Sequence, residues 1–187
     1  MPRGKLIVVE GLDNVGKTTF IQYFLKKNPL VIHRKFPSRH VADTMNQIKY
    51  ADINWNMFHD LFHNDLQRGI HEIEQTLASG ASVVCDRYVY SHWVYEYLRG
   101  NKIPCDFVLV PNPDVIIYLR PERLKDIPNE DKDNLELGID YEKGQERFDK
   151  LFIKKPEFRN VITIPALEWN TNDLAMQALQ TILGVFV

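Results

Sequence analysis

The stretch GLDNVGKTT, Gly11 to Thr19, follows directly on the apolar run LIVVE, Leu6 to Glu10. It matches the pattern G-x-x-x-x-G-K-[ST], with a glycine at each end of the loop followed by Lys17 and Thr18. Glycines let successive backbone N–H groups turn toward one point and form a concave nest for an anion. A helix that begins at Thr18 directs the positive end of its dipole at the same point. The stretch therefore predicts a strand, an anion-binding loop and a helix, in that order.

The side chains of this loop predict a site for a nucleoside triphosphate and Mg²⁺. Lys17 reaches the β- and γ-phosphates as a compact charge, and the hydroxyl of Thr18 is a ligand for the metal ion. A chain of this length matches the pattern by chance on the order of once in a hundred cases. The strand before the loop and the helix after it lower that frequency further. A glycine-rich turn without a ligand is therefore a minority interpretation.

The composition is that of a globular protein with a single domain, residues 1–187. The formal net charge of -2 gives no reason to expect nucleic acid or an anionic membrane as a partner. Of the two cysteines, Cys85 lies in an apolar run as a core residue would, so no disulfide framework is expected. No apolar stretch approaches the ~18 residues of a membrane span, and the N-terminus enters a strand without room for a signal peptide. We expect a cytoplasmic protein, with the nucleus as the other compartment that fits.

Short apolar runs alternate with helical patterns along the chain. The runs are Lys5–Glu10, Pro29–Phe36, Ala81–Asp86, Asp114–Leu119 and Asn160–Ile164. The first and the last three are apolar on both faces, which is typical of parallel strands covered on both sides. Helices are predicted at Thr18–Lys27 and at Asn54–Ser79, the latter closed by Gly80. The alternation predicts an α/β fold, a five-stranded parallel sheet flanked by helices.

A polar, mostly charged segment, Arg120–Gly138, is broken by Pro128 and interrupts this alternation. It is either a solvated loop or a mobile lid over a site, and its position after a strand favours the lid, at about residues 120–140.

The sequence DRY, Asp86 to Tyr88, follows the third apolar run. An acidic residue at the carboxyl end of a strand beside such a loop holds Mg²⁺, often through water, so Asp86 is a candidate metal ligand beside Thr18. The alternative is an aspartate that caps a helix or turn. Arg87 is well placed to bind an anion, although a single arginine is more often a surface ion-pair partner.

Four segments in this order resemble the thymidylate kinases: RGKLIVVEGLDNVGKTT, FPSR (Phe36–Arg39), DRY with Ser91 after it, and PNPDVIIYL. The resemblance extends from Arg3 to about Tyr141. It implies the P-loop kinase fold, a homodimer, and transfer of the γ-phosphoryl group of ATP to dTMP, giving dTDP for dTTP synthesis, with Mg²⁺ as cofactor. ATP is then bound by Gly11, Asp13, Asn14, Val15, Gly16, Lys17, Thr18 and Thr19.

The resemblance also assigns roles around the acceptor nucleotide. Asp13 accepts the sugar 3′-hydroxyl, and Arg39 and Arg87 hold the acceptor phosphate. The remaining substrate contacts fall on Phe36, Pro37, Phe62, Ser91, Tyr95 and Tyr141. Phe62 stacks on the base in this view, and core packing alone explains it equally well. A phosphate monoester is mostly a dianion at neutral pH, so it needs alignment and positive charge rather than a general base.

Two departures from the family pattern concern charge and the base. Asn14 is neutral where many relatives carry a basic residue, so either Arg120 or Arg123 supplies the missing positive charge, or the enzyme is slow. We favour Arg123, in the acidic lid, as the catalytic residue that joins Lys17, Arg39 and Arg87. Replacing Arg123 by alanine is then expected to lower kcat by orders of magnitude while dTMP binding persists. Relatives also place an arginine four residues after the stacking aromatic, where this chain has Leu66. Arg68 lies on another face of that helix, so base recognition either uses Asn64, Asp65 or water, or is looser than in those relatives. His92 and Trp93 add bulk after Ser91, and we hypothesise that dUMP or a related deoxypyrimidine monophosphate is accepted about as well as dTMP.

Two other functions stay open from the sequence. A deoxynucleoside kinase would need a carboxylate base after the second strand, where KFPSR offers Arg39 instead. A nucleotide-binding protein without catalysis fits Asn14 and the acidic lid, whereas Lys17, Thr18 and Asp86 argue against it.

Overall fold

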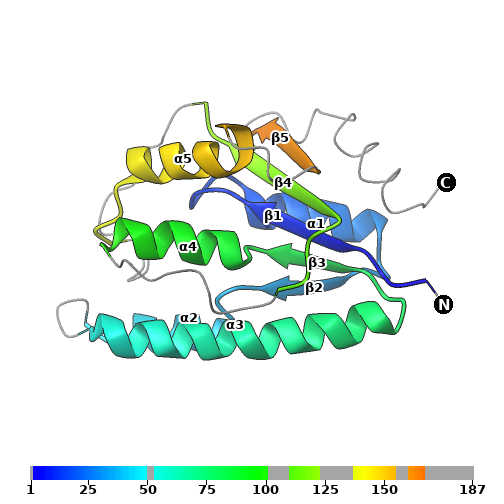
Figure 1. The fold of residues 1–187 in the computed structure, drawn as a ribbon, viewed down its shortest axis with the longest axis horizontal. Helices are drawn as coiled ribbons and strands as arrows, with labels where there is room; N and C mark the ends of the chain where they lie inside the picture. Colours follow the sequence, from blue (N-terminus) through cyan, green and yellow to red (C-terminus); the bar gives the residue numbers. More distant parts are fainter. Residues whose placement is uncertain (1, 50–52, 101–109, 123–136, 155–159, 167–187) are drawn as a thin grey trace.

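A computed structural model describes residues 2–49, 53–100, 110–122, 137–154 and 160–166 of the chain. Within them one sheet of five parallel strands has the order β2-β3-β1-β4-β5 (Figure 1). The strands are β1 Leu6–Glu10, β2 Ile32–Lys35, β3 Val83–Asp86, β4 Val115–Arg120 and β5 Val161–Pro165. The helices are α1 Lys17–Lys27, α2 Arg39–Asn46, α3 Trp55–Ala78, α4 Val89–Leu98 and α5 Tyr141–Asp149, which continues as the π-helical segment η3 Lys150–Lys154. The predicted five-stranded parallel sheet flanked by helices is confirmed.

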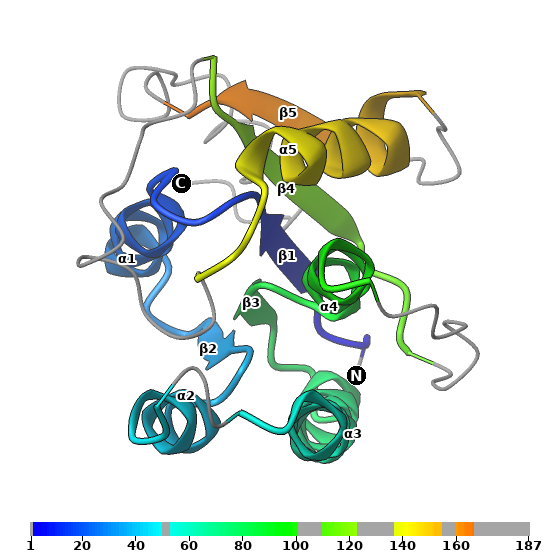
Figure 2. The same cartoon turned by 90° about the vertical axis from the view of Figure 1, so that its left-hand side faces the viewer.

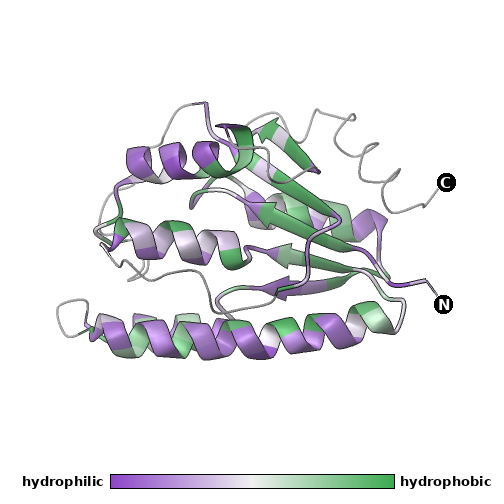
Figure 3. Cartoon of the chain, viewed as in Figure 1, coloured by the Kyte–Doolittle hydropathy of each residue, from purple (hydrophilic) through white to green (hydrophobic). Residues whose placement is uncertain are grey.

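Helices cover both faces of the sheet (Figure 2). Seen along the strands, α1 lies on one face, and α4 and α5 lie on the other. Hydrophobic residues are concentrated on the strands, whereas hydrophilic residues are frequent along α3 and α5 (Figure 3). Among the described residues, none of the helices combines the length and the apolar character that crossing a bilayer requires.

The three inner strands carry the core. Every residue of β1 and β3 is buried, and so are the first five residues of β4. Strand β2 differs from them, because Ile32, His33 and Lys35 are exposed. In the described part of the chain this strand lies at the edge of the sheet, next to β3, so charged residues are tolerated there.

Helix α3 shows how the local sequence sets the bounds of an element. The side chain of Asn54 caps its first turn, because Oδ1 accepts hydrogen bonds from the backbone N–H groups of Asn56 (3.1 Å) and Met57 (3.2 Å). At the other end Ser79 is the C-cap, and Gly80 has φ 90°. The predicted helix Asn54–Ser79 is thus confirmed to within one residue at each end, and α1 begins one residue earlier than predicted.

Candidate active site

The loop between β1 and α1 has the backbone that the sequence pattern predicts. Gly11 has φ 145°, and a Cβ atom there would lie 2.6 Å from the carbonyl oxygen of Leu119 in β4. Gly16 has φ 89° and immediately precedes the first turn of α1. Asn14 has φ 59°, a left-handed conformation that asparagine tolerates better than most residues. The residue type at position 14 therefore has a conformational reason as well as the electrostatic one considered above.

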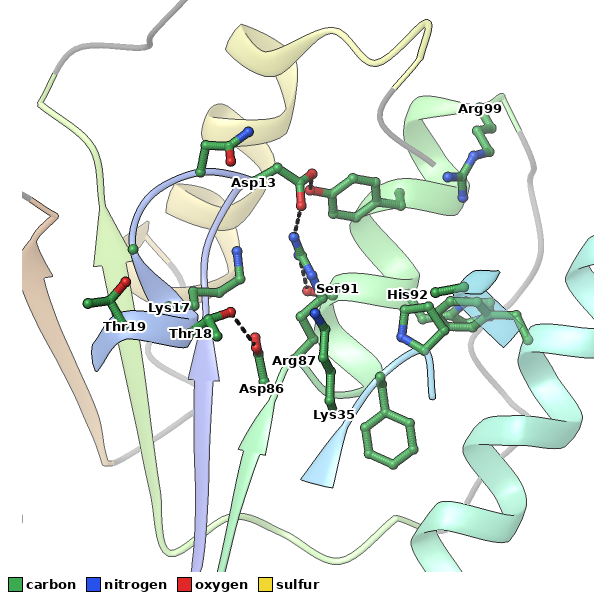
Figure 4. Close-up of a pocket in the computed structure, with 17 residues that line it drawn as sticks. Asp13, Lys17, Thr18, Thr19, Lys35, Asp86, Arg87, Ser91, His92 and Arg99 are labelled. Carbon is green, nitrogen blue, oxygen red and sulfur yellow. Dashed lines mark hydrogen bonds and ion pairs between the residues drawn. The ribbon is translucent and has the colours of Figure 1, made fainter. Parts of the chain in front are cut away.

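A cavity of about 440 Å³ lies at the carboxyl ends of β1, β2 and β3 (Figure 4). Ligands of open parallel α/β sheets bind at this edge. From the loop and the start of α1 the cavity is lined by Asp13, Asn14, Gly16, Lys17, Thr18 and Thr19. The turn after β2 contributes Phe36 and Pro37, and α4 contributes a face of polar and aromatic side chains.

Lys17 is buried at the floor of this cavity. Its ammonium group donates a hydrogen bond to the carbonyl oxygen of Leu12. Burial, together with the charge of Arg87, lowers the pKa of Lys17 from 10.5 to about 7. Two cations held so close together make the cavity a favourable site for phosphate groups.

Thr18 and Asp86 meet across the sheet as candidate metal ligands. The hydroxyl of Thr18 donates a hydrogen bond of 3.0 Å to Oδ2 of Asp86 (Figure 4). The other oxygen of Asp86, Oδ1, is buried and has no hydrogen-bond partner among the described residues. A carboxylate with an unsatisfied oxygen beside a hydroxyl is an all-oxygen set of the kind that Mg²⁺ prefers, so these residues fit the ion.

Arg87 occupies the middle of the cavity, where it is held by several groups. It follows β3 with φ 71°, and its Nη1 donates to the carbonyl oxygen of Gly11 (3.1 Å) and to Oγ of Ser91 (3.0 Å). Its Nη2 forms an ion pair with Asp13, whose second oxygen accepts a hydrogen bond from the hydroxyl of Tyr95. Burial by itself raises the pKa of Asp13, but the charges of Arg87 and Lys17 outweigh it and hold that pKa below its ordinary value.

A buried carboxylate stands behind this network. Glu10, at the end of β1, accepts hydrogen bonds from the backbone N–H groups of Tyr88 (2.9 Å) and Ser91 (3.2 Å) and one of 2.5 Å from the hydroxyl of Ser91. Burial raises its pKa from 4.5 to about 7, although the bond from Ser91 and the charge of Arg87 oppose the rise. Glu10 thereby fixes the turn that carries Arg87. The sequence signal for it was only an acidic residue at the end of an apolar run.

Aromatic rings line the end of the cavity away from the loop. Phe62 from α3 and His92 from α4 stack with their ring centroids 4.9 Å apart and their planes 8° from parallel. His92 stacks in turn on His59, at 5.4 Å. Phe62 therefore faces the cavity rather than serving only as a core residue, and its ring stacks on that of His92.

The structure brings most of the sequence-predicted site residues together. The cavity is lined by Asp13, Asn14, Gly16, Lys17, Thr18, Thr19, Phe36, Pro37, Phe62, Asp86, Arg87, Ser91 and Tyr95. Gly11 and Val15 belong to the loop but do not line the cavity, and Tyr141 packs against the main core at the start of α5. Arg123 and lid residues 123–136 lie outside the described residues.

Arg39 is placed differently from the other predicted residues. It is the first residue of α2, does not line the cavity, and has a side chain that is 93% exposed. Its Nε lies 3.5 Å from Asp43, one turn further along the same helix. Exposed pairs of this kind contribute little energy, so the side chain is held only weakly in this orientation.

Sequence reasoning did not assign a role to two cations and a small residue that line the cavity. Lys35, at the end of β2, points toward the phosphate end, and Arg99 stands at the end of α4. Ala42 from α2 completes the wall. Lys35 directly precedes the FPSR segment, which is the one signal that pointed to it. Nothing in the sequence singled out Arg99, because only the packing of α4 against α3 brings it to the cavity.

Comparison with known proteins places the chain in a family. The family model described as thymidylate kinase matches residues 9–172. A thymidylate kinase of Plasmodium falciparum is 37% identical over 130 residues, which are 63% of this chain and 61% of that protein. A probable thymidylate kinase of Pyrococcus horikoshii is 28% identical over 98% of this chain and 100% of its own length. The alignments with the Plasmodium falciparum and Caenorhabditis elegans relatives span about three fifths of those proteins, 61% and 62%.

Solved structures agree on the fold. The thymidylate kinase of Candida albicans superposes with a TM-score of 0.69 at 20% identity, covering 96% of this chain and 92% of that one, and its structure was described as revealing the origin of broad substrate specificity. The enzyme of Ehrlichia chaffeensis superposes equally well, at 19% identity, with 95% and 99% coverage. Together with the matched family model, which covers most of the chain, these findings establish that this protein belongs to the thymidylate kinase family.

Proposed function

We propose that this protein transfers the γ-phosphoryl group of ATP to dTMP and releases ADP and dTDP. The observation that carries the proposal is one cavity with a phosphate cradle at Lys17 and Thr18, the Arg87–Asp13 pair in its middle and the stacking ring of Phe62 at its far end. A nucleotide laid along it has its phosphate at the cations and its base at the rings. Family membership supports the same assignment.

The residues of the cavity have distinct tasks in this reaction. The backbone of Gly11 to Thr19 and the ammonium of Lys17 hold the triphosphate of ATP. Arg87 holds the acceptor phosphate against it, while Asp13 and Tyr95 receive the sugar hydroxyl. The acceptor is a dianion near neutral pH and attacks without a general base, so the contribution of the protein is alignment and positive charge.

Mg²⁺ is proposed as the cofactor, held by Thr18 and Asp86. When bound, the ion neutralises negative charge on the β- and γ-phosphate oxygens. The unpartnered Oδ1 of Asp86 supports this assignment.

Arg39 is proposed to complete the grip on the acceptor phosphate by turning away from Asp43 once that phosphate is bound. Its exposed side chain and long contact to Asp43 leave it able to turn. Lys35, which already lines the cavity, adds positive charge at the same end. Arg123 remains the proposed source of charge from the lid.

A homodimer is proposed on the family resemblance alone, and a cytoplasmic or nuclear location is proposed on the composition and cysteine content of the sequence. Sedimentation equilibrium tests the first: a mass of twice 21.9 kDa is expected, and a purely monomeric chain contradicts it. Imaging of a fluorescent fusion in the source cell tests the second.

An assay of ADP release coupled to NADH oxidation tests the activity. We expect Mg²⁺-dependent ADP release with dTMP and a loss of at least about 10²-fold in kcat for Lys17→Ala. The acceptors dUMP, dCMP and dGMP run alongside. No release above the rate without acceptor, in a chain that still binds MgATP, would indicate a nucleotide-binding protein without this activity.

A further inference from the structure

Helix α4 presents one face to the cavity, and this face reaches past the phosphate end. Its members Ser91, His92, Tyr95 and Arg99 recur at the spacing of a single helix face, and all four line the cavity. Ser91 contacts Arg87, Tyr95 contacts Asp13, and His92 stacks on Phe62. Arg99 lies beyond them, at the C-cap of the helix.

Helix α3, on the opposite side, offers little polar chemistry to the same end. Phe62 lines the cavity, but Leu66, one turn later, is fully buried in the core. The side chain of Arg68 is 66% exposed and pairs with Asp65 at 3.3 Å instead of lining the cavity. A base that stacks among these rings therefore meets its polar neighbours on α4.

The guanidinium of Arg99 is held in place by rings and a carboxylate. Its Cζ lies 5.0 Å from the ring centroid of Trp55, 5.4 Å from that of Phe58 and 5.8 Å from that of Tyr95. Nη1 contacts Oε1 of Glu96 at 3.3 Å, and the side chain is only 12% exposed. Aromatic faces fix the orientation of a guanidinium group that stacks on them. Arg99 is therefore a rigid, planar group of donors on the wall of the cavity.

Charge separates Arg99 from the other cations of the cavity. Lys17, Lys35 and Arg87 gather around Thr18 and Asp86, whereas Arg99 stands apart at the end of α4 (Figure 4). His92 adds no charge beside it near neutral pH, because burial lowers its pKa to about 4 despite the nearby Glu96 carboxylate. Among the described residues that line the ring-bearing end of the cavity, Arg99 is the permanent cation.

We propose that Arg99 selects the base of the acceptor nucleotide by donating hydrogen bonds to the exocyclic carbonyl oxygen at position 4 of a pyrimidine. This inference rests on the proposed function of the cavity and specifies its substrate class. Cytosine carries an amino group at that position, which would set donor against donor. Sites built around such a bond reject analogues that lack the acceptor far more strongly than apolar pockets do. Uracil and thymine share the carbonyl, so Arg99 favours both over cytosine and does not distinguish them.

Replacement of Arg99 by methionine tests the assignment, with Arg68→Met as the matched control on α3. Values of kcat/KM are measured for dTMP, dUMP and dCMP at saturating MgATP. In Arg99→Met we expect kcat/KM to fall about 10- to 100-fold for dTMP and dUMP alike, the range expected for a hydrogen bond to a charged group. The value for dCMP should change less than about threefold, and the KM for ATP should stay as in the wild type. Arg68→Met should leave all of these ratios unchanged.

The decisive readout is the kcat/KM value for dTMP divided by that for dCMP, because a merely structural role of Arg99 would lower both values together. An unchanged ratio overturns the inference. If Arg99→Met does not fold, Arg99→Lys serves instead, because it keeps the charge but loses the planar guanidinium. It should still lower the ratio of the kcat/KM values for dTMP and dCMP.

Calorimetric binding of dTMP and dCMP separates this inference from the proposed function. A wild-type chain that releases no ADP overturns the proposed activity, but preferential binding of dTMP that Arg99→Met abolishes still supports the role of Arg99. Equal binding of both nucleotides by the wild type overturns it.

Discussion

The fold sets the pKa values of single residues in the cavity. Lys17 is fully buried beside Arg87, and its pKa of about 7 means that part of the population is neutral near physiological pH when no phosphate is present. Phosphate oxygens in contact with the ammonium favour the charged form and raise the pKa again. Nucleotide binding and protonation of Lys17 are therefore coupled.

This coupling predicts that MgATP binding takes up protons above pH 7. Titration calorimetry at pH 8 in buffers of different ionisation enthalpy should show an uptake approaching about one proton per ATP, and the affinity should fall by up to tenfold per pH unit from pH 7 to 9. Lys17→Arg, which stays charged, is the control and should show no such uptake. Equal proton counts in the two proteins would refute the coupling.

A second prediction concerns Glu10, whose folded pKa of about 7 lies above the ordinary 4.5. A raised carboxyl pKa favours folding when the group is protonated, so this contribution is present below pH 4.5 and is lost as the pH rises through 7. Between pH 4.5 and 8 the wild type should lose at most about 3 kcal/mol of unfolding free energy relative to Glu10→Gln. Urea unfolding of both proteins at the two pH values measures it, and parallel pH profiles would contradict it.

Elements position the cavity through close contacts between them. Helix α3 carries Gly69 in its interior, where glycine costs about 1 kcal/mol relative to alanine. A Cβ atom at that position would lie 2.4 Å from Cε1 and 2.5 Å from Cζ of Phe36. Phe36 in turn lines the cavity and is 3% exposed. The glycine therefore lets the turn after β2 pack directly on the helix.

Gly69→Ala is expected to push the ring of Phe36 toward the acceptor end of the cavity. Overpacking of this kind typically costs 1–3 kcal/mol of unfolding free energy. Because the displaced ring narrows the acceptor end of the cavity, the KM for dTMP should also rise, on the order of tenfold for a loss of about 1.4 kcal/mol of binding free energy, while the KM for ATP stays constant. Glu74→Ala, at an exposed position of the same helix, is the control for helix propensity. Steady-state kinetics of both variants measure the effect, and an unchanged KM for dTMP would show that Phe36 adapts without moving into the cavity.

At the scale of the whole molecule, the sheet joins residues that are distant along the chain. Thr18 and Asp86 are 68 residues apart, and the pairing of β1 with β3 brings them into contact. Ligands that bind only the folded chain stabilise it by about 2.7 kcal/mol at a hundred times their Kd. For a chain of this size that corresponds to a rise of about 5–10 °C in Tm.

Asp86→Asn should remove the part of this stabilisation that depends on Mg²⁺. We expect ATP with Mg²⁺ to raise the Tm of the wild type by several degrees more than ATP with EDTA, and this difference to vanish in the variant. Asp43→Asn, on the surface of α2, is the control and should behave as the wild type. A full Mg²⁺ effect in Asp86→Asn would show that the ion is held elsewhere.

The sequence by itself determined those features whose physics is local. The loop from Gly11 to Thr19 is contiguous in the sequence. Its glycines, Lys17 and Thr18 therefore specify an anion-binding site without the help of distant residues. Alternating strand and helix patterns determined a parallel α/β sheet, since parallel strands require crossovers. The ends of α3 are also set locally, by the N-cap Asn54 and by Gly80, which follows the C-cap Ser79.

Only the tertiary structure decided what depends on the neighbours of a side chain. The position of β3 next to β1 placed Asp86 and Arg87 beside the loop, and the edge position of β2 left its residues exposed although the run reads as a strand. Arg39 was expected in the cavity, but its side chain lies beside Asp43 on the surface. Arg99 reached the cavity because α4 packs its polar face there. These environments depend on the packing of segments that are distant along the chain, and this packing cannot be inferred from the pattern of residue types.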